Sequence, residues 1–216
     1  MVRSLAPWLW LLDFRATRKA LDASDDPSGE LSAALGEHFT EVHSLRANNA
    51  RLEEFNTANE AQGWRPASVH AGTARDIKWP DGTFDCVALH DALTRSAHSE
   101  RQVIQELDEY RRILRGDGWL VLASPTPRAA ARGQAETPAI PRRRLTRLVE
   151  QSDFREVRCL WFEHMIERPL FLIPNSRRTI EAYEAMRGSA SRQRRAAAKA
   201  GLNSLLYPAY FLLARA

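Results

Sequence analysis

The sequence is poor in cysteine and lysine and has no long apolar run. Only two cysteines occur among its 216 residues, Cys86 and Cys159, and both lie inside short apolar segments. This excludes a disulfide framework and favours a reducing, cytoplasmic compartment. No segment reaches the roughly twenty apolar residues that a membrane-spanning helix needs. The six histidines show no metal-ligand spacing, so no metal site is predicted.

The composition that remains is that of a folded globular protein. Hydrophobic residues make up 44% of the chain and charged residues 27%, which excludes disorder as the main state. A length of 216 residues is typical of one domain, so residues 1–216 are predicted to form a single domain. Its net charge of +4 is distributed unevenly: residues 1–100 carry ten basic and fifteen acidic side chains, and residues 101–216 carry 21 and twelve.

This asymmetry has two interpretations. The first is a solvated surface without a binding role. The second is a basic C-terminal half that contacts a polyanion, either nucleic acid, an anionic lipid surface or an acidic protein partner. A homodimer is a further interpretation that the composition leaves open.

The first 18 residues contain an apolar run, Leu5 to Leu12, which Pro7 interrupts. Asp13, Phe14 and Arg15 follow where a signal peptide would have small residues. We therefore expect a short amphipathic helix within residues 1–18 that packs on the domain. A weaker alternative is a contact of Trp8 and Trp10 with a membrane surface.

Residues 19–125 alternate between strand and helix patterns, which predicts an open, mostly parallel α/β sheet. Strands are expected at 19–23, 41–45, 67–71, 84–89 and 119–123, and helices at 30–39, 48–62 and 99–114. A loop is expected at 124–141, a basic helix at 142–151 and strands at 157–162 and 207–214.

Between the last two strands lies a basic insertion, residues 163–204, with a helix-prone stretch from Arg177 to Ala200. Its apolar run, Pro169 to Pro174, is expected to line a pocket, to dock a partner or to cover the edge of the sheet. Its arginines are expected to form either a solvated lid helix or a polyanion-binding face, although only Tyr183 is near enough for base stacking.

The order of these pieces resembles a class I S-adenosylmethionine (SAM)-dependent methyltransferase. Trp79 to Val87, WPDGTFDCV, is similar to the family's passage into its fourth strand. Glu106 to Ser124, ELDEYRRILRGDGWLVLAS, is similar to the helix, turn and strand that follow. The resemblance implies a Rossmann-like fold with a mostly parallel seven-stranded sheet flanked by helices and a helical insertion before the last strand. It also implies that residues 19–125 form the cofactor-binding half and 126–216 the C-terminal half.

The resemblance places a SAM site at positions where this sequence departs from the family's motif. The loop after the first strand is glycine-rich in the family, but here it is Asp22-Ala23-Ser24-Asp25-Asp26-Pro27-Ser28-Gly29. Asp22, Ser24, Asp26 and Gly29 take the motif's positions. Asp25 and Asp26 would place two carboxylates close to the SAM carboxylate, where like charges repel each other.

Two further contacts of the family are also altered. Arg46 stands where an acidic residue accepts hydrogen bonds from the ribose hydroxyls, and arginine has donors only. Thr73, before Ala74, replaces the acid that contacts the adenine, and Asp76 lies close enough for a shifted loop to use it. If each lost contact costs about 1.5 kcal/mol, SAM affinity falls roughly a thousandfold.

The candidates for catalytic chemistry are His90 and Asp91, which follow the 84–89 strand at the edge where open α/β sheets bind ligands. His90 would act as a general base that Asp91 orients. His90 also belongs to the positions of the implied cofactor site. The alternative is a histidine without a catalytic role.

Two hypotheses of function follow. In the first, the chain is a methyltransferase-like protein with an eroded SAM pocket, a weak or non-catalytic member that acts in binding or as a partner subunit. In the second, it is an active SAM-dependent methyltransferase that modifies an oxygen or nitrogen of a small molecule or glycan. In a third, minor alternative, another ligand takes the same cleft.

Overall fold

The computed structural model describes residues 9, 11–24, 28–62, 65–73, 75–76, 79–90, 99–131, 139–162, 171–187 and 192–216. The strands are β1 (Lys19–Asp22), β2 (Glu41–Arg46), β3 (Ser68–Ala71), β4 (Phe84–His90), β5 (Leu114–Pro125), β6 (Arg155–Phe162), β7 (Leu172–Pro174) and β8 (Ala209–Arg215). The helices are α1 (Glu30–Gly36), α2 (Asn49–Gln62), α4 (Glu100–Ile113), α5 (Pro127–Ala131), α6 (Arg142–Gln151), α7 (Arg177–Met186), α8 (Arg192–Lys199) and α9 (Asn203–Leu206).

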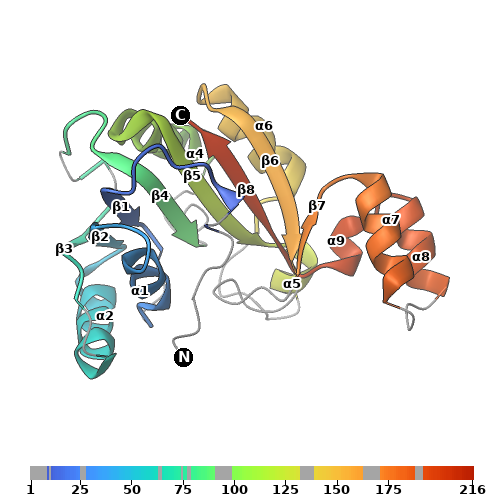
Figure 1. The fold of residues 1–216 in the computed structure, drawn as a ribbon, viewed down its shortest axis with the longest axis horizontal. Helices are drawn as coiled ribbons and strands as arrows, with labels where there is room; N and C mark the ends of the chain where they lie inside the picture. Colours follow the sequence, from blue (N-terminus) through green and yellow to red (C-terminus); the bar gives the residue numbers. More distant parts are fainter. Residues whose placement is uncertain are drawn as a thin grey trace.

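The eight strands form one sheet in the order β3-β2-β1-β4-β5-β8-β6-β7 (Figure 1). The five strands from β3 to β5 pair in parallel, whereas β8 lies antiparallel between β5 and β6. This is the α/β architecture that the alternating pattern predicted, with one strand more than the seven expected. The additional strand is β7, an antiparallel edge strand on β6. It comes from the apolar run in the insertion, so part of that run covers the sheet edge.

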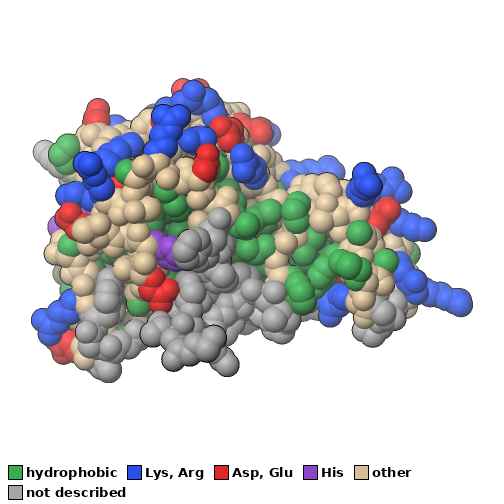
Figure 2. Space-filling view, in the orientation of Figure 1, with side chains coloured by type: hydrophobic (Ala, Val, Ile, Leu, Met, Phe, Trp, Pro, Cys, Tyr) green, Lys and Arg blue, Asp and Glu red, His purple; other side chains and the backbone are tan. Residues whose placement is uncertain are grey.

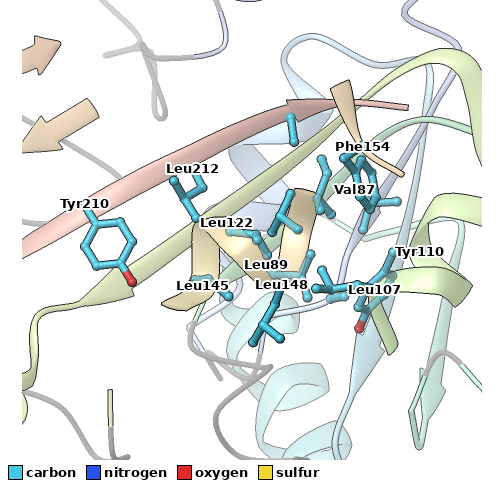
Figure 3. Close-up of a cluster of buried hydrophobic side chains, with 14 of the residues drawn as sticks. Val87, Leu89, Leu107, Tyr110, Leu122, Leu145, Leu148, Phe154, Tyr210 and Leu212 are labelled. Carbon is cyan, nitrogen blue, oxygen red and sulfur yellow. The ribbon is translucent and has the colours of Figure 1, made fainter. Parts of the chain in front are cut away.

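Two apolar layers enclose the sheet. On one face, α4 and α6 bury leucines and a tyrosine against the strands (Figure 3). The residues in contact include Leu107 and Tyr110 of α4, Leu145 and Leu148 of α6, and Val87, Leu89, Leu122 and Leu212 of the strands. The other face packs against α1 and the N-terminal segment. Both faces of the central strands are therefore covered, which explains why β4 is apolar at nearly every position.

Local signals fix the starts of two helices. The Ser99 side chain accepts a hydrogen bond from the Gln102 amide at the start of α4. The Ser176 side chain accepts one from the Thr179 amide at the start of α7. A serine at such a position satisfies an amide that has no partner inside the helix. Both helices therefore begin at residues that the sequence marks.

Residues 9 and 11–18 are the described part of the N-terminal segment in which a short helix is predicted. Its described part forms a single turn, in which the Leu12 amide donates to the Leu9 carbonyl, and residues 13–18 belong to no helix. The Asp85 carboxylate accepts the amides of Arg18 and Lys19, which holds the approach to β1 along the start of β4. Leu9 and Leu12 are buried against the sheet, so this part of the segment packs on the domain as expected.

The insertion, together with residues 205–207 before β8, forms a lobe beyond the β6–β7 edge (Figure 1). Within it, α7 packs against α8, and α8 packs against α9. The buried Glu184 carboxylate accepts two hydrogen bonds from Arg194 at 2.9 Å each and one from the Tyr207 hydroxyl at 3.0 Å. These bonds tie α7 and α8 to the start of β8. Within the part of the chain described above, no helix is long and apolar enough to cross a bilayer.

Two regions, β5 and the segment that follows it, differ in detail from expectation. The strand expected at 119–123 extends over the whole of β5 and begins at Leu114, directly after α4. Gly116 and Gly118 therefore lie within β5, where its register with β4 shifts between the pairs Phe84–Leu114 and Cys86–Trp119. Residues 127–131 of the expected loop form α5, and residues 132–138 lie outside the described residues.

Candidate functional site

The carboxyl ends of β1, β2, β3 and β4 meet at one edge of the sheet, which is where open α/β proteins bind their ligands. Asp22 ends β1 there and its side chain is fully buried. One carboxylate oxygen accepts the Ser24 amide at 2.9 Å. The other accepts the Ser32 hydroxyl and, at 2.9 Å, the Arg46 guanidinium. The Asp22 side chain thus connects the loop after β1, helix α1 and the end of β2.

Arg46 ends β2 and is also fully buried. Besides the ion pair with Asp22, its guanidinium donates to the carbonyls of Ser24 at 2.9 Å and Leu45 at 3.0 Å. The ring of Phe55 from α2 lies beneath it, with 3.8 Å between the guanidinium carbon and the ring centroid. The guanidinium therefore fills the space between the ends of β1 and β2, and its positive charge is not exposed to solvent.

The burial of this ion pair determines how much it contributes to the free energy of unfolding. Both side chains have 0% exposure, so neither charge is screened by water. A buried ion pair contributes little net stability compared with apolar residues, but removal of one partner leaves an uncompensated charge and costs about 3–5 kcal/mol. The buried Ser24 hydroxyl has no hydrogen-bond partner among the residues that the structure describes. The two strand ends are thus joined by a charged contact that the fold depends on.

Gly29 keeps one feature of the glycine-rich loop. It has a φ of +71°, which favours glycine, and it caps the start of α1. A Cβ added there would lie 2.7 Å from the side-chain oxygen of Asn59 in α2. Asn59 is itself buried and its amide group donates to the Phe55 carbonyl at 2.7 Å. Gly29 therefore lets the start of α1 approach α2.

Thr73 lies in the turn after β3, where its amide and hydroxyl donate to one oxygen of the Asp76 carboxylate at 2.6 and 2.8 Å. These two hydrogen bonds lower the pKa of Asp76 below its usual value. Gly72 precedes Thr73 with a φ of +128°, and a Cβ there would lie 3.0 Å from the same carboxylate. Asp76 is therefore present at this edge, as the sequence suggested, but it is turned back onto Thr73.

The remaining predicted site residues are divided between described and undescribed segments. His90 is the last residue of β4, half-buried, and pairs in register with Ala123 of β5. Its position at the carboxyl edge is the expected one. Asp91, the proposed orienting partner, lies outside the described residues, as do Asp25, Asp26 and Ala74.

Sequence reasoning missed four residues that complete the site. The Ser32 hydroxyl bonds Asp22 and lies 2.8 Å from the Ser44 hydroxyl, and Phe55 and Asn59 close the site from α2. One signal was available: Asp22 and Ser44 are opposite each other in the β1–β2 register. The contribution of α2 could not be found in this way, because the packing of a helix across strand ends leaves no mark in the spacing.

A second polar cluster lies on the α4 and α6 face of β2 and β3. His43 bonds the Glu41 carboxylate through Nε2 at 2.9 Å and the Ser68 hydroxyl through Nδ1 at 2.6 Å. Ser68 also bonds Nε2 of His70 at 2.9 Å. Burial lowers the pKa of His43, and Glu41 opposes this shift. The cluster satisfies polar groups where the described part of the β3–β4 connection has turns and no helix.

The rings of Phe84 and Trp79 pack edge-on against His43 and His70, with centroid separations of 5.4 Å in both pairs. We therefore assign this cluster a structural role. A search of the described ranges finds no group of three or more His, Cys, Asp or Glu side chains arranged to hold a metal ion.

Comparison with known proteins finds one family model that matches part of this chain and solved structures that share its fold. Residues 27–122 match the family described as a methyltransferase domain. No curated protein matches the sequence. Among solved structures, a SAM-dependent methyltransferase from Archaeoglobus fulgidus is 16% identical with a TM-score of 0.64, over 97% of this chain and 90% of that one.

Two other solved structures show the same fold. A SAM-dependent methyltransferase from Methanosarcina mazei is 13% identical with a TM-score of 0.62, over 99% of this chain and 98% of that one. Phosphoethanolamine N-methyltransferase 2 from Haemonchus contortus, in complex with phosphomonomethylethanolamine and S-adenosylhomocysteine, is 13% identical with a TM-score of 0.60. That likeness covers 96% of this chain and 51% of the other. Identities this low establish the fold alone.

Proposed function

We propose that this chain, which belongs to the class I SAM-dependent methyltransferase family, is a member whose cofactor site has become part of its structural core. It would act by binding, as a partner subunit, and not by methyl transfer. The observation that carries the proposal is the buried ion pair between Arg46 and Asp22.

The chemistry of Arg46 supports this function. Ribose hydroxyls placed at the end of β2 would need a hydrogen-bond acceptor, and a guanidinium offers only donors. Its two terminal nitrogens donate to Asp22 and to the backbone of the loop after β1, while its buried Nε finds no hydrogen-bond partner among the described residues. That loop is the segment that the family uses to approach the methionine part of SAM. A ligand at this edge would have to displace the guanidinium. The Asp22 carboxylate would then remain buried in the core without its cation.

The residues near the adenine position also support it. The Asp76 carboxylate could accept from an adenine amino group, but one of its oxygens already accepts two hydrogen bonds from Thr73. SAM therefore does not fit the described side chains at the ribose position and would have to compete for the carboxylate at the adenine position. We derive no catalytic step through it.

The second candidate is an active methyltransferase that modifies an oxygen or nitrogen of a small molecule or glycan. Gly29 favours it, because this glycine keeps the positive φ and the close helix approach of a cofactor loop. His90 at the carboxyl edge of β4 is the residue that could accept a proton from the substrate.

A gain-of-binding experiment separates the two candidates. The double variant Asp22→Asn/Arg46→Asp restores an acceptor at the end of β2 without placing two carboxylates side by side. The amide oxygen of the introduced asparagine can still accept the Ser24 amide. Under the proposal, the wild type binds S-adenosylhomocysteine weakly in isothermal titration calorimetry, and the variant binds about tenfold to a hundredfold more tightly.

A matched control is Arg101→Gln on α4, where the loss of an exposed arginine changes the net charge by one negative unit, as the double variant does. It should leave the affinity unchanged. Micromolar affinity of the wild type, with a loss of affinity in the double variant, would show that the pocket works as it stands and would support the active enzyme instead.

A further inference from the structure

The insertion exposes large apolar side chains to solvent. Among the described residues, five large hydrophobic side chains are exposed, and four of them lie in this lobe. Met186 is 78% exposed, and Phe171, Leu202 and Leu205 are each 48% exposed. Single exposed leucines are common, but a group of them on one small lobe marks an interaction surface. Figure 2 shows hydrophobic side chains gathered over the region of β7 and α9.

Basic side chains adjoin this apolar group along one face of α8. Arg192, Arg195 and Lys199 are spaced at i, i+3 and i+7, so they share a face, and all three are exposed. The opposite side of α8 faces the protein, because Ala198 is buried and Arg194 bonds Glu184 of α7. Figure 2 shows Lys and Arg side chains projecting from the outer rim of the lobe.

The turn after α8 brings the two features together. Gly201 has a φ of +71°, and its amide donates to the Ala198 carbonyl. The Leu202 amide then donates to the Ala197 carbonyl at 2.9 Å, which holds Leu202 close to the last turn of α8. Leu205 follows one turn later on α9. The helix that carries the basic face is thus connected directly, through the turn at Gly201, to the segment that carries the two exposed leucines.

The charge of this lobe is strongly one-sided. Residues 171–207 contain seven basic and two acidic side chains, a net charge of +5. Both acidic groups are already paired, Glu181 with Arg177 and Glu184 with Arg194. The exposed face of α8 therefore presents positive charge next to apolar side chains.

We propose that the insertion surface, defined as the exposed face of α8 (Arg192, Arg195 and Lys199) together with Phe171, Met186, Leu202 and Leu205, docks the protein on an anionic lipid surface. Basic residues beside aliphatic ones are what an interfacial contact with acidic headgroups and acyl chains requires. A nucleic acid would use the charge but not the leucines, and the lobe exposes Phe171 as its main aromatic side chain. This inference does not depend on whether the chain binds SAM.

A vesicle flotation assay tests this docking. The full chain is mixed with vesicles of phosphatidylcholine that contain about one part in three phosphatidylserine, and in parallel with vesicles of pure phosphatidylcholine. The proposal predicts flotation with the anionic vesicles and little with the neutral ones. Raising the salt concentration should weaken binding, because the electrostatic part is screened.

Two variants divide the surface into its charged and apolar parts. Arg192→Gln/Arg195→Gln should lower the vesicle partition coefficient about thirtyfold, which corresponds to about 1 kcal/mol for each basic residue at the membrane. Leu202→Ser/Leu205→Ser should lower it about tenfold, since the leucines would enter the acyl boundary. The matched control Arg101→Gln/Arg143→Gln removes the same charge from α4 and α6 and should change binding less than about twofold.

Four outcomes would overturn the proposal. They are no flotation with anionic vesicles, equal flotation with neutral vesicles, and an equal loss in the control, which would indicate net charge and not this surface. The fourth is that the wild type does not float with vesicles but self-associates or binds single-stranded RNA. In that case Leu202→Ser/Leu205→Ser would abolish this other interaction. Far-ultraviolet circular dichroism of each variant confirms that the comparison is between folded proteins.

Discussion

Arginine has opposite roles at the carboxyl edge of β1 and β2 and in the insertion. At the strand ends, Arg46 is fully buried, and the Asp22 carboxylate, three backbone carbonyls and an aromatic ring hold it. On α8, Arg192 and Arg195 are exposed. The same side chain type therefore closes a site in one region and presents charge to the outside in the other.

The difference shows that burial decides what a charge can do, and composition alone does not. At the strand ends, the cost of desolvating a guanidinium is offset by a fixed set of acceptors, so Arg46 has become part of the core. On the insertion, the charges stay hydrated and remain able to attract a partner. The pair of Glu184 and Arg194 is intermediate between these two cases. Its carboxylate is buried, as that of Asp22 is, but its arginine belongs to the basic lobe and is partly exposed.

The largest expected effect is at the strand ends. Arg46→Ala leaves the Asp22 carboxylate buried without its cation, so the free energy of unfolding should fall by about 3–5 kcal/mol. Urea denaturation followed by circular dichroism measures it. Arg195→Ala, on the exposed face of α8, is the matched control and should change stability by less than about 0.5 kcal/mol. If both variants lost the same free energy of unfolding, the buried and the exposed arginine would not differ in their contribution to stability, and the comparison would fail.

A smaller effect is expected inside the insertion. Glu184→Gln removes the charge that Arg194 and the Tyr207 hydroxyl contact, and it should lower the free energy of unfolding by about 1.5–3 kcal/mol. The Arg194 cation holds the pKa of Glu184 below its usual value, in agreement with this pairing. Amide hydrogen exchange should show the loss in α7 and α8 and not in β1 or β2.

The control for that variant is Glu181→Gln, which breaks an exposed pair with Arg177 on the same helix. An exposed pair of this spacing contributes about 0.3–0.5 kcal/mol. If Glu181→Gln were as damaging as Glu184→Gln, the buried contact would not be what holds the lobe together.

The smallest effect concerns pH and His43. Burial lowers the pKa of His43 in the folded state, so the unfolded chain takes up the proton first as the pH falls. Stability should therefore decline on acidification below about pH 6.5, the ordinary histidine pKa, and level off once the folded protein is also protonated. Urea denaturation across this range, compared with His43→Gln, isolates this contribution. A wild type and a variant with the same slope would show that His43 is not the group responsible.

Much of the fold could be predicted from the sequence, because each element carries its own local signal. The apolar run of β4 and the 3.6-residue periodicity of α4 led to elements close to those found. The extra strand β7 could not be placed, since three residues of an apolar run give no information about their pairing partner. Gly116 and Gly118 indicated a turn, but they lie within β5, between Leu114, which pairs with Phe84, and Trp119, which pairs with Cys86.

The candidate site was predictable in position but not in contacts. The sequence placed Asp22, Arg46 and Thr73 at one edge, and all three are found there. It could not show that Arg46 turns inward to Asp22, because the direction of a long side chain depends on the acceptors that other elements supply. The contributions of Ser32 and Phe55 are of the same kind, since both come from helices packed across the strand ends.

The most direct test of the central claim is a calorimetric titration of the wild-type protein with S-adenosylhomocysteine. If Arg46 and Asp22 have closed the ribose position, the titration should show no saturable binding in the micromolar range. A micromolar Kd with one ligand per chain would contradict the account, because it would require Arg46 to leave the buried position that it occupies beside Asp22.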